Sequence, residues 1–112
     1  MRTLRFIVDN QIIMQDPNCD FSGLVPGTEG YLLAEFSFSS EWAGCVKVAG
    51  FYSPLGTEYE PQVLRDGKTC LIPAEALTRR TFKVRVIGKR SSKPQDLMLS
   101  TNKLTVRQNG GK

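Results

Sequence analysis

The residue types that most enzymes use for catalysis are scarce in this sequence. Its 112 residues include no histidine, the commonest general base and the commonest transition-metal ligand of proteins. A serine or threonine nucleophile needs such a base beside it. Glu58 and Glu60 come closest to a carboxylate pair, but they lie beside a proline and a turn, as on a solvated edge. Gly23, Gly27 and Gly30 lack the lysine and the strand-to-helix context of a phosphate loop. We therefore predict a protein that is not an enzyme and that uses no metal or cofactor.

The three cysteines indicate a reducing compartment. Cys19, Cys45 and Cys70 cannot all pair within one chain, and no two of them have the C-x-x-C spacing of a zinc or redox site. The order Cys19, Trp42, Cys70 is that of the disulfide and tryptophan of an immunoglobulin domain. However, Cys19 lies among turn residues instead of in a core strand. We predict three free thiols, with Cys45 and Cys70 buried.

Positive charge is concentrated in the last third of the chain. The net charge is +4, and several cations fall close together after residue 78. The candidate polyanion-binding residues among them are Arg79, Arg80, Lys83, Arg85, Lys89 and Arg90. Such a group is typical of proteins that contact acidic partners. The alternation of Lys83 and Arg85 with apolar neighbours also fits the solvated face of an ordinary strand, so we do not expect nucleic acid as the partner.

Alternation of apolar and polar residues predicts the elements that carry these side chains. Phe82, Val84 and Val86 alternate with other residues in segment 81–88, and segment 30–38 alternates in the same way. This period is typical of antiparallel sheets with one packed face and one solvated face. Further strands are predicted over 4–8, 11–14, 45–52, 57–64, 68–72, 97–101 and 104–107, with one helical turn over 73–77.

The length of the chain fits one domain. We predict an all-β, antiparallel two-sheet β-sandwich, with about seven to nine short strands and at most one or two helical turns. A closed barrel is the alternative. The domain should span residues 1–107, followed by a flexible end over 108–112. The predicted core residues are Phe36, Phe38, Trp42, Val46, Val48, Ile72, Leu77, Phe82, Val84 and Val86.

No apolar stretch in the sequence is long enough to cross a membrane. The apolar run near the start ends at Asp9, too early for the core of a signal peptide. We therefore expect a protein without a signal peptide and without a membrane partner.

Four local patterns together resemble a known group of proteins. Glu41-Trp42-Ala43-Gly44 follows a Phe-Ser-Phe strand, residues 70–77 read CLIPAEAL, residues 82–88 read FKVRVIG, and residues 101–104 read TNKL. They resemble the immunoglobulin-like β-sandwich modules of tailed bacteriophages and prophages of Gram-positive bacteria, which occur in baseplate and tail-fibre proteins and as small structural proteins. The resemblance covers residues 31–107 and implies a virion structural module of a tail, baseplate or capsid surface. Its partners would be other phage structural proteins or further copies of itself. The resemblance also implies that the protein is made in the bacterial cytoplasm and, as a structural module, becomes part of the virion.

Two other functions stay open from the sequence. One is a phage-encoded protein that binds and inhibits a host factor, and the other is a module that binds a carbohydrate or polyanion such as a host surface glycan. Trp42 either packs at the corner of the sandwich or stacks on a sugar ring, with Tyr52 and Tyr59 as neighbouring aromatic residues.

Two segments are predicted to contact a partner. Residues 57–64 include Tyr59 and Pro61, and a proline confines a strand to the edge of a sheet, where another chain can extend it. The connection over 16–30 contains Phe21, Leu24 and Val25, which are apolar residues in a predicted loop. Their alternative role is to fold back and close the end of the sandwich.

Overall fold

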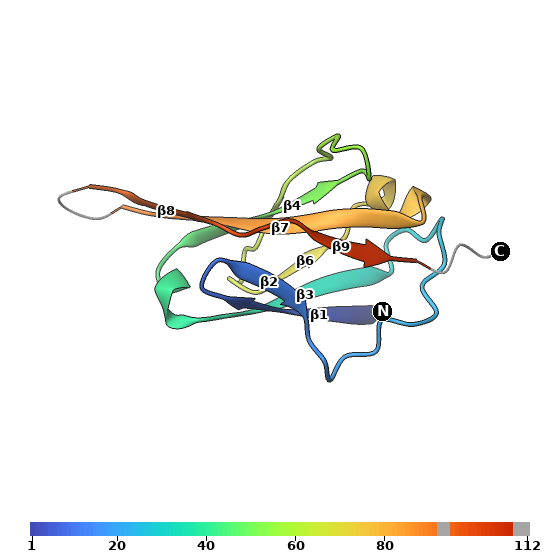
Figure 1. Ribbon diagram of the computed structural model, residues 1–112, viewed down its shortest axis with the longest axis horizontal. Coiled ribbons are helices and arrows are strands. Elements are labelled where there is room, and N and C mark those ends of the chain that lie inside the picture. The colour runs from blue at the N-terminus through green and yellow to red at the C-terminus, as the bar shows by residue number, and fades with distance from the viewer. Residues whose placement is uncertain (92–94, 109–112) are drawn as a thin grey trace.

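Two β-sheets packed face to face form the protein in a computed structural model that describes residues 1–91 and 95–108 (Figure 1). The first sheet has the strand order β2-β1-β3-β6, with β1 at Arg2–Asp9, β2 at Ile12–Gln15, β3 at Leu32–Phe38 and β6 at Thr69–Leu71. The second has the order β5-β4-β7-β8, with β4 at Val46–Tyr52, β5 at Gln62–Val63, β7 at Thr81–Arg90 and β8 at Leu97–Ser100. In addition, β9 (Leu104–Arg107) pairs with β7.

Two short 3₁₀-helices, η1 (Ser40–Trp42) and η2 (Ala74–Thr78), complete the described part of the chain, so the predicted all-β, two-sheet sandwich is confirmed. None of the helices in these described residues is long and apolar enough to cross a bilayer.

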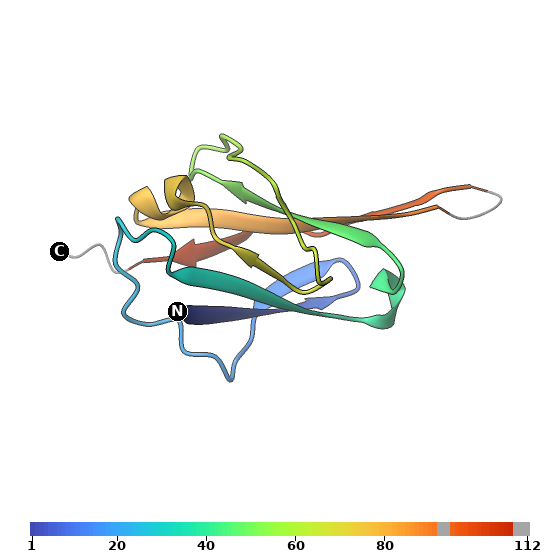
Figure 2. The same ribbon diagram turned by 180° about the vertical axis from the view of Figure 1, so that it is seen from behind.

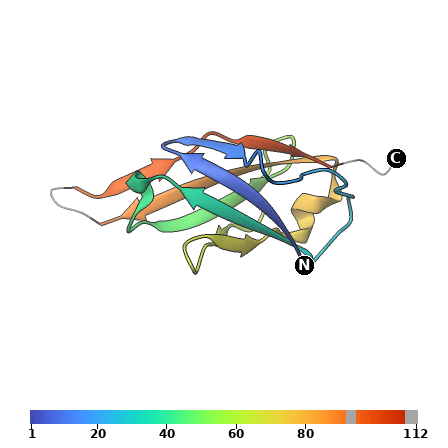
Figure 3. The ribbon, with the colours of Figure 1, turned by 90° about the horizontal axis from the view of Figure 1, so that it is seen from below.

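One strand pair departs from the predicted antiparallel arrangement. β1 and β3 run parallel, in register from Arg2 opposite Leu32 to Val8 opposite Phe38. Parallel neighbours cannot be joined by a tight turn and need a long connection. Residues 16–31 supply it, and Figure 3 shows this segment passing around the end of the sandwich where β1 begins.

The segment expected as a strand over 57–64 is mostly irregular. Its only regular parts are β5, two residues long, and a single bridge between Tyr52 and Glu58. β5 does lie at the edge of the second sheet, as the proline before it predicted.

Most of the predicted core lies between the sheets. Seven of its members are at most 1% exposed, and Phe38 is partly buried against them. The prediction is wrong for Val46, which is 65% exposed, and for Val48, which is only half-buried. In β4 the inward positions are instead those of Ala49 and Phe51, because strand residues alternate between the two faces.

The corner next to η1 is closed by Trp42. Its side chain is fully buried, and its Nε1 donates to the carbonyl oxygen of Asn10 at 2.7 Å. The indole ring lies against Gly88 so closely that a Cβ on this glycine would stand 2.8 Å from two ring carbons. Trp42 is therefore a core residue, and its ring has no free face for a sugar.

Gln108, which lies one residue beyond the predicted domain, packs against the sandwich instead of belonging to a flexible end. Gln108 is 2% exposed, and its Nε2 donates to the carbonyl oxygens of Leu77 and Arg79 at 3.2 and 2.6 Å. The rest of the predicted flexible end, residues 109–112, lies outside the described residues.

All three cysteines are free thiols, and Cys45 and Cys70 are buried, so both parts of that prediction are confirmed.

Candidate binding face

The outer face of the second sheet carries apolar side chains where solvated residues are expected. On this face Val63 lies opposite Val48, and Val48 lies opposite Ile87, so three neighbouring strands each contribute one. Val46 and Met98 extend the group toward β8 and are 65% and 61% exposed. One solvated face of an antiparallel sheet is ordinarily polar, and contiguous exposed apolar surface marks interaction sites.

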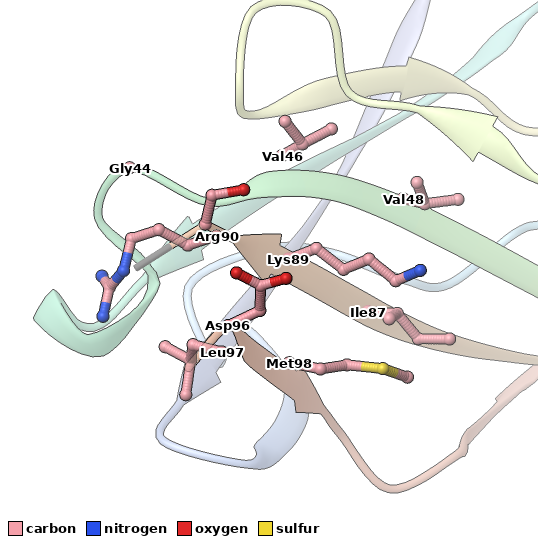
Figure 4. Close-up of a pocket in the computed structure, with 10 residues that line it drawn as sticks. Gly44, Val46, Val48, Ile87, Lys89, Arg90, Asp96, Leu97 and Met98 are labelled. Carbon is pink, nitrogen blue, oxygen red and sulfur yellow. The ribbon is translucent and has the colours of Figure 1, made fainter. Parts of the chain in front are cut away.

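Part of this surface is hollowed. Val46, Val48, Ile87, Leu97 and Met98 line a depression of about 650 Å³, which we call the apolar hollow (Figure 4). Gly44, Lys89, Arg90, Ser91 and Asp96 complete its lining.

The hollow lies at the base of a projecting hairpin. Figures 1 and 2 show β7 and β8 continuing beyond the rest of the sandwich, and the molecule measures 53 × 29 × 21 Å. Arg90 anchors the hairpin to the η1 corner, because its Nη1 donates to the carbonyl oxygen of Ala43 at 2.7 Å. The hollow therefore has a floor of paired strands and lies beside an extended arm.

Cations share the outer face with the apolar hollow. Lys83, Arg85 and Lys89 lie in the outward phase of β7, which Ile87 shares, whereas Val84, Val86 and Gly88 of the other phase are buried. Lys103 joins them, with its Nζ 4.1 Å from the centre of the Tyr52 ring. We call these four residues the cation group.

The cation group has no carboxylate partner among the residues that the structure describes. The one ion pair found in that part of the chain joins Arg5 and Glu35 of the first sheet. Arg85 instead donates from Nε to the hydroxyl oxygen of Tyr52 at 2.9 Å. The tyrosine is 3% exposed and lies over Gly50, whose missing side chain leaves room for it. The positive charge on this face is therefore not neutralised within the described chain.

The structure brings together only part of the predicted polyanion site. Lys83, Arg85 and Lys89 lie on one face, as their alternation predicted. Arg79 and Arg80 are exposed in the turn between η2 and β7 and do not line the hollow. Arg90 lines the hollow at its edge, with its guanidinium directed to the η1 corner (Figure 4).

The predicted partner-binding residues mostly serve the core. Leu24 is 3% exposed, Phe21 packs edge-to-face on Phe6 with ring centres 5.4 Å apart, and Tyr59 packs against the core. The alternative role, closing the sandwich, therefore holds for Phe21 and Leu24. Val25 and Pro61 are exposed, but neither lines the apolar hollow.

Sequence reasoning missed the apolar hollow, although one signal was present. In β7, Ile87 points to the same side of the strand as Lys83 and Arg85. An apolar residue therefore occupies a position where the alternation predicts a solvated side chain. Val48 was assigned to the core because both phases of segment 45–52 are apolar.

The clearest pKa shifts lie away from this face. Hydrogen bonds from the Thr69 side chain and from the backbone amides of Thr69 and Lys68 lower the pKa of Asp66 to about 2. Burial raises the pKa of the Cys70 thiol to about 12, with a smaller contribution from the charge of Asp66. These groups belong to the β5–β6 turn and to β6, where the hydrogen bonds hold the turn together.

Within the described residues, no three Cys, Asp or Glu side chains cluster in a way that suits a metal ion. No protein-family model matches the sequence, and no curated protein resembles it significantly.

Proposed function

We propose that this protein is a non-enzymatic assembly module that binds a protein partner through the outer face of its second sheet. The apolar hollow carries the proposal. Val46, Val63 and Met98 are each at least half exposed on one sheet face. Single exposed apolar residues are ordinary, whereas a contiguous group of them on a rigid surface is typical of a protein-binding site.

The exposed apolar surface is large enough to drive binding. Burial of a valine or methionine side chain contributes about 1.5–3 kcal/mol relative to full exposure. Covering the exposed parts of Val46, Val63 and Met98 would therefore contribute on the order of 3–5 kcal/mol, before the cost of association. Polar contacts around the rim would supply the remaining affinity and the orientation of the partner.

The sequence resemblance supports a virion as the place of assembly. Its strand and corner residues are similar to those of tailed-phage and prophage modules. The partner would then be another phage structural protein or a further copy of this chain, in a tail, baseplate or capsid surface.

The proposal is tested on purified phage particles from the host that carries the gene. We expect mass spectrometry to find the wild-type chain in the particles. Met98→Asp, which places a charge on the hollow, should be lost from them. Ile12→Asp is the matched control, because Ile12 is 58% exposed on β2 of the other sheet, and this variant should be retained. A wild-type chain that is absent from the particles, and monomeric by light scattering up to millimolar concentration, would favour a host-factor inhibitor instead.

Polyanion binding is a second candidate function, favoured by the unpaired cation group. Affinity for an anionic glycan or a teichoic-acid-like polymer would then fall steeply as salt rises, because each neutralised phosphate or sulfate releases counterions. Met98→Asp should reduce such binding only modestly, since the polymer needs charge and not the apolar floor.

A further inference from the structure

We infer that the segment held by this face is an acidic, extended stretch of a partner protein, with one large apolar side chain seated in the apolar hollow. The inference rests on the proposed protein-binding function and adds to it the chemistry of the partner. Two observations carry it, namely the unpaired charge of the cation group and the position of Ile87 among the cations of β7.

The spacing of β7 sets the pattern that a partner must match. Lys83, Arg85, Ile87 and Lys89 are successive outward positions of one strand. Every second residue of a strand advances by about 6.7 Å, and the same holds for an extended peptide lying along it. A partner with acidic residues at alternate positions, and one large apolar residue in the same phase, would place its carboxylates near the cations and its apolar side chain over Ile87.

Charge also argues against a second copy of the chain as the occupant. A symmetric dimer through this face would bring two copies of the cation group together, and like charges in an interface are costly. The only carboxylate that lines the hollow among the described residues is Asp96, and no ion pair joins it to the cation group. An acidic segment instead supplies the carboxylate partners that the cation group lacks.

Nucleic acid fits this face less well than an acidic peptide. Proteins that bind single strands stack bases on exposed aromatic rings. Tyr52, an aromatic residue on this face, is only 3% exposed, and Lys103 stands over its ring. The apolar floor would also remain uncovered by a phosphate backbone.

The volume of the hollow, about 650 Å³, falls within the roughly 300–1,000 Å³ of clefts that hold ligand groups.

The inference is tested by selection from a library of random dodecapeptides displayed on yeast, with the folded wild-type chain as the labelled target. Counter-selection uses two exposed-site variants, Lys89→Glu and Met98→Asp, after circular dichroism has shown that both are folded. The matched controls are Arg79→Glu and Ile12→Asp, which place the same charges on exposed positions away from the hollow. Enriched peptides are then synthesised, and their dissociation constants are measured by fluorescence anisotropy.

We expect the enriched peptides to contain acidic residues at alternate positions with one large apolar residue in the same phase. Lys89→Glu and Met98→Asp should each weaken their binding by at least about tenfold, whereas the two controls should change it by less than about twofold. Binding should also weaken as salt is raised from low to moderate concentration.

Three results would overturn the inference, and each has a different consequence for the proposed function. Enriched peptides that are neutral or basic, yet sensitive to Met98→Asp, would disprove the acidic chemistry and leave protein binding at this face intact. If no selected peptide depends on Lys89 or Met98 for binding, this face is not a peptide-binding site. The proposed assembly function would then depend on the result of the experiment with phage particles. Equal binding of an oligothymidine and of polyglutamate to wild type and Met98→Asp would identify a general polyanion site.

Discussion

The packing of the Trp42 corner can be tested by adding one methyl group at Gly88. A Cβ at this position would lie 2.8 Å from Cε3 and Cζ3 of Trp42 and 3.2 Å from Cβ of Cys45. Carbon atoms pack at about 3.5–4.0 Å, so the ring or the strand would have to move by most of an ångström. The ring is held by its hydrogen bond to Asn10, and Gly88 is paired with a strand on each side.

The cost of Gly88→Ala follows from these contacts. Overpacking of a core costs about 1–3 kcal/mol, and a rigid ring against a paired backbone belongs in the upper half of that range. Alanine also restricts the unfolded chain, which returns about 0.4–1 kcal/mol. We therefore expect the free energy of unfolding to fall by about 1–2.5 kcal/mol, and Tm to fall by roughly 4–10 °C.

The assay is urea unfolding followed by circular dichroism, together with the fluorescence of Trp42, which is the single tryptophan of the chain. The same substitution is then made in a Trp42→Leu background, where the ring atoms that the new methyl group meets are absent. There Gly88→Ala should cost less than about 0.5 kcal/mol, so the two changes are strongly coupled. The reasoning is refuted if Gly88→Ala is as stable as wild type, or if its cost is the same in both backgrounds.

Four further predictions concern single side chains. Gln108→Met removes the donor that serves the carbonyl oxygens of Leu77 and Arg79 and should lower the free energy of unfolding by about 1–3 kcal/mol. Gln108→Glu should lower the free energy of unfolding further, because its carboxylate would place an acceptor opposite those carbonyl oxygens. Urea unfolding at pH 7 measures both variants, and a Glu variant more stable than the Met variant would contradict this prediction. Phe82→Ala should lower the free energy of unfolding by about 3–5 kcal/mol, because Phe82 is fully buried. Val46→Ala, at an exposed position, should change it by no more than about 0.5 kcal/mol. Similar losses of stability in the two variants would mean that the faces of the sheet are misassigned. The thiol of Cys70, whose pKa is raised to about 12, should not react with a thiol reagent at pH 8 in the native protein. After unfolding, all three cysteines should react, whereas fast reaction of more than one thiol in the native protein would argue against this burial. The pKa of Asp66 is lowered to about 2, below its unfolded value near 4, so its contribution to stability is present above about pH 4 and is lost as pH falls toward 2. The stability difference between wild type and Asp66→Asn should therefore shrink over that interval, and a constant difference would contradict the assignment.

The strand positions could be predicted from the sequence because their signals are local. Alternation identified β7, and turn residues separated it from its neighbours, so most predicted strands agree with the observed ones within a few residues. The parallel pairing of β1 with β3 has no local signal, since it depends on where the connection over 16–31 leads the chain.

The face of β4 was misassigned for a different reason. Its two phases are almost equally apolar, with Val46 and Val48 in one and Ala49 and Phe51 in the other. The choice between them depends on which phase meets the opposite sheet, and the pairing of Val48 with Ile87 outside the core settles it. The candidate site was missed together with the strand face, because an exposed valine in a strand cannot be told from a buried one by composition.

The parallel pair of β1 and β3 also bears on how the chain folds. Arg2 lies opposite Leu32, so the central pair of the first sheet joins residues 30 positions apart. In the second sheet, β4 and β7 pair Tyr52 with Lys83 and Val46 with Lys89, which are still more distant in sequence. Neither central pair can form by closing a tight hairpin, and sandwiches of such non-local pairing fold in about milliseconds to seconds. Until those pairs close, the inward side chains of β1 and β4 stay accessible to other unfolded chains. Refolding yield should therefore fall as protein concentration rises, even though the native sandwich buries those side chains completely.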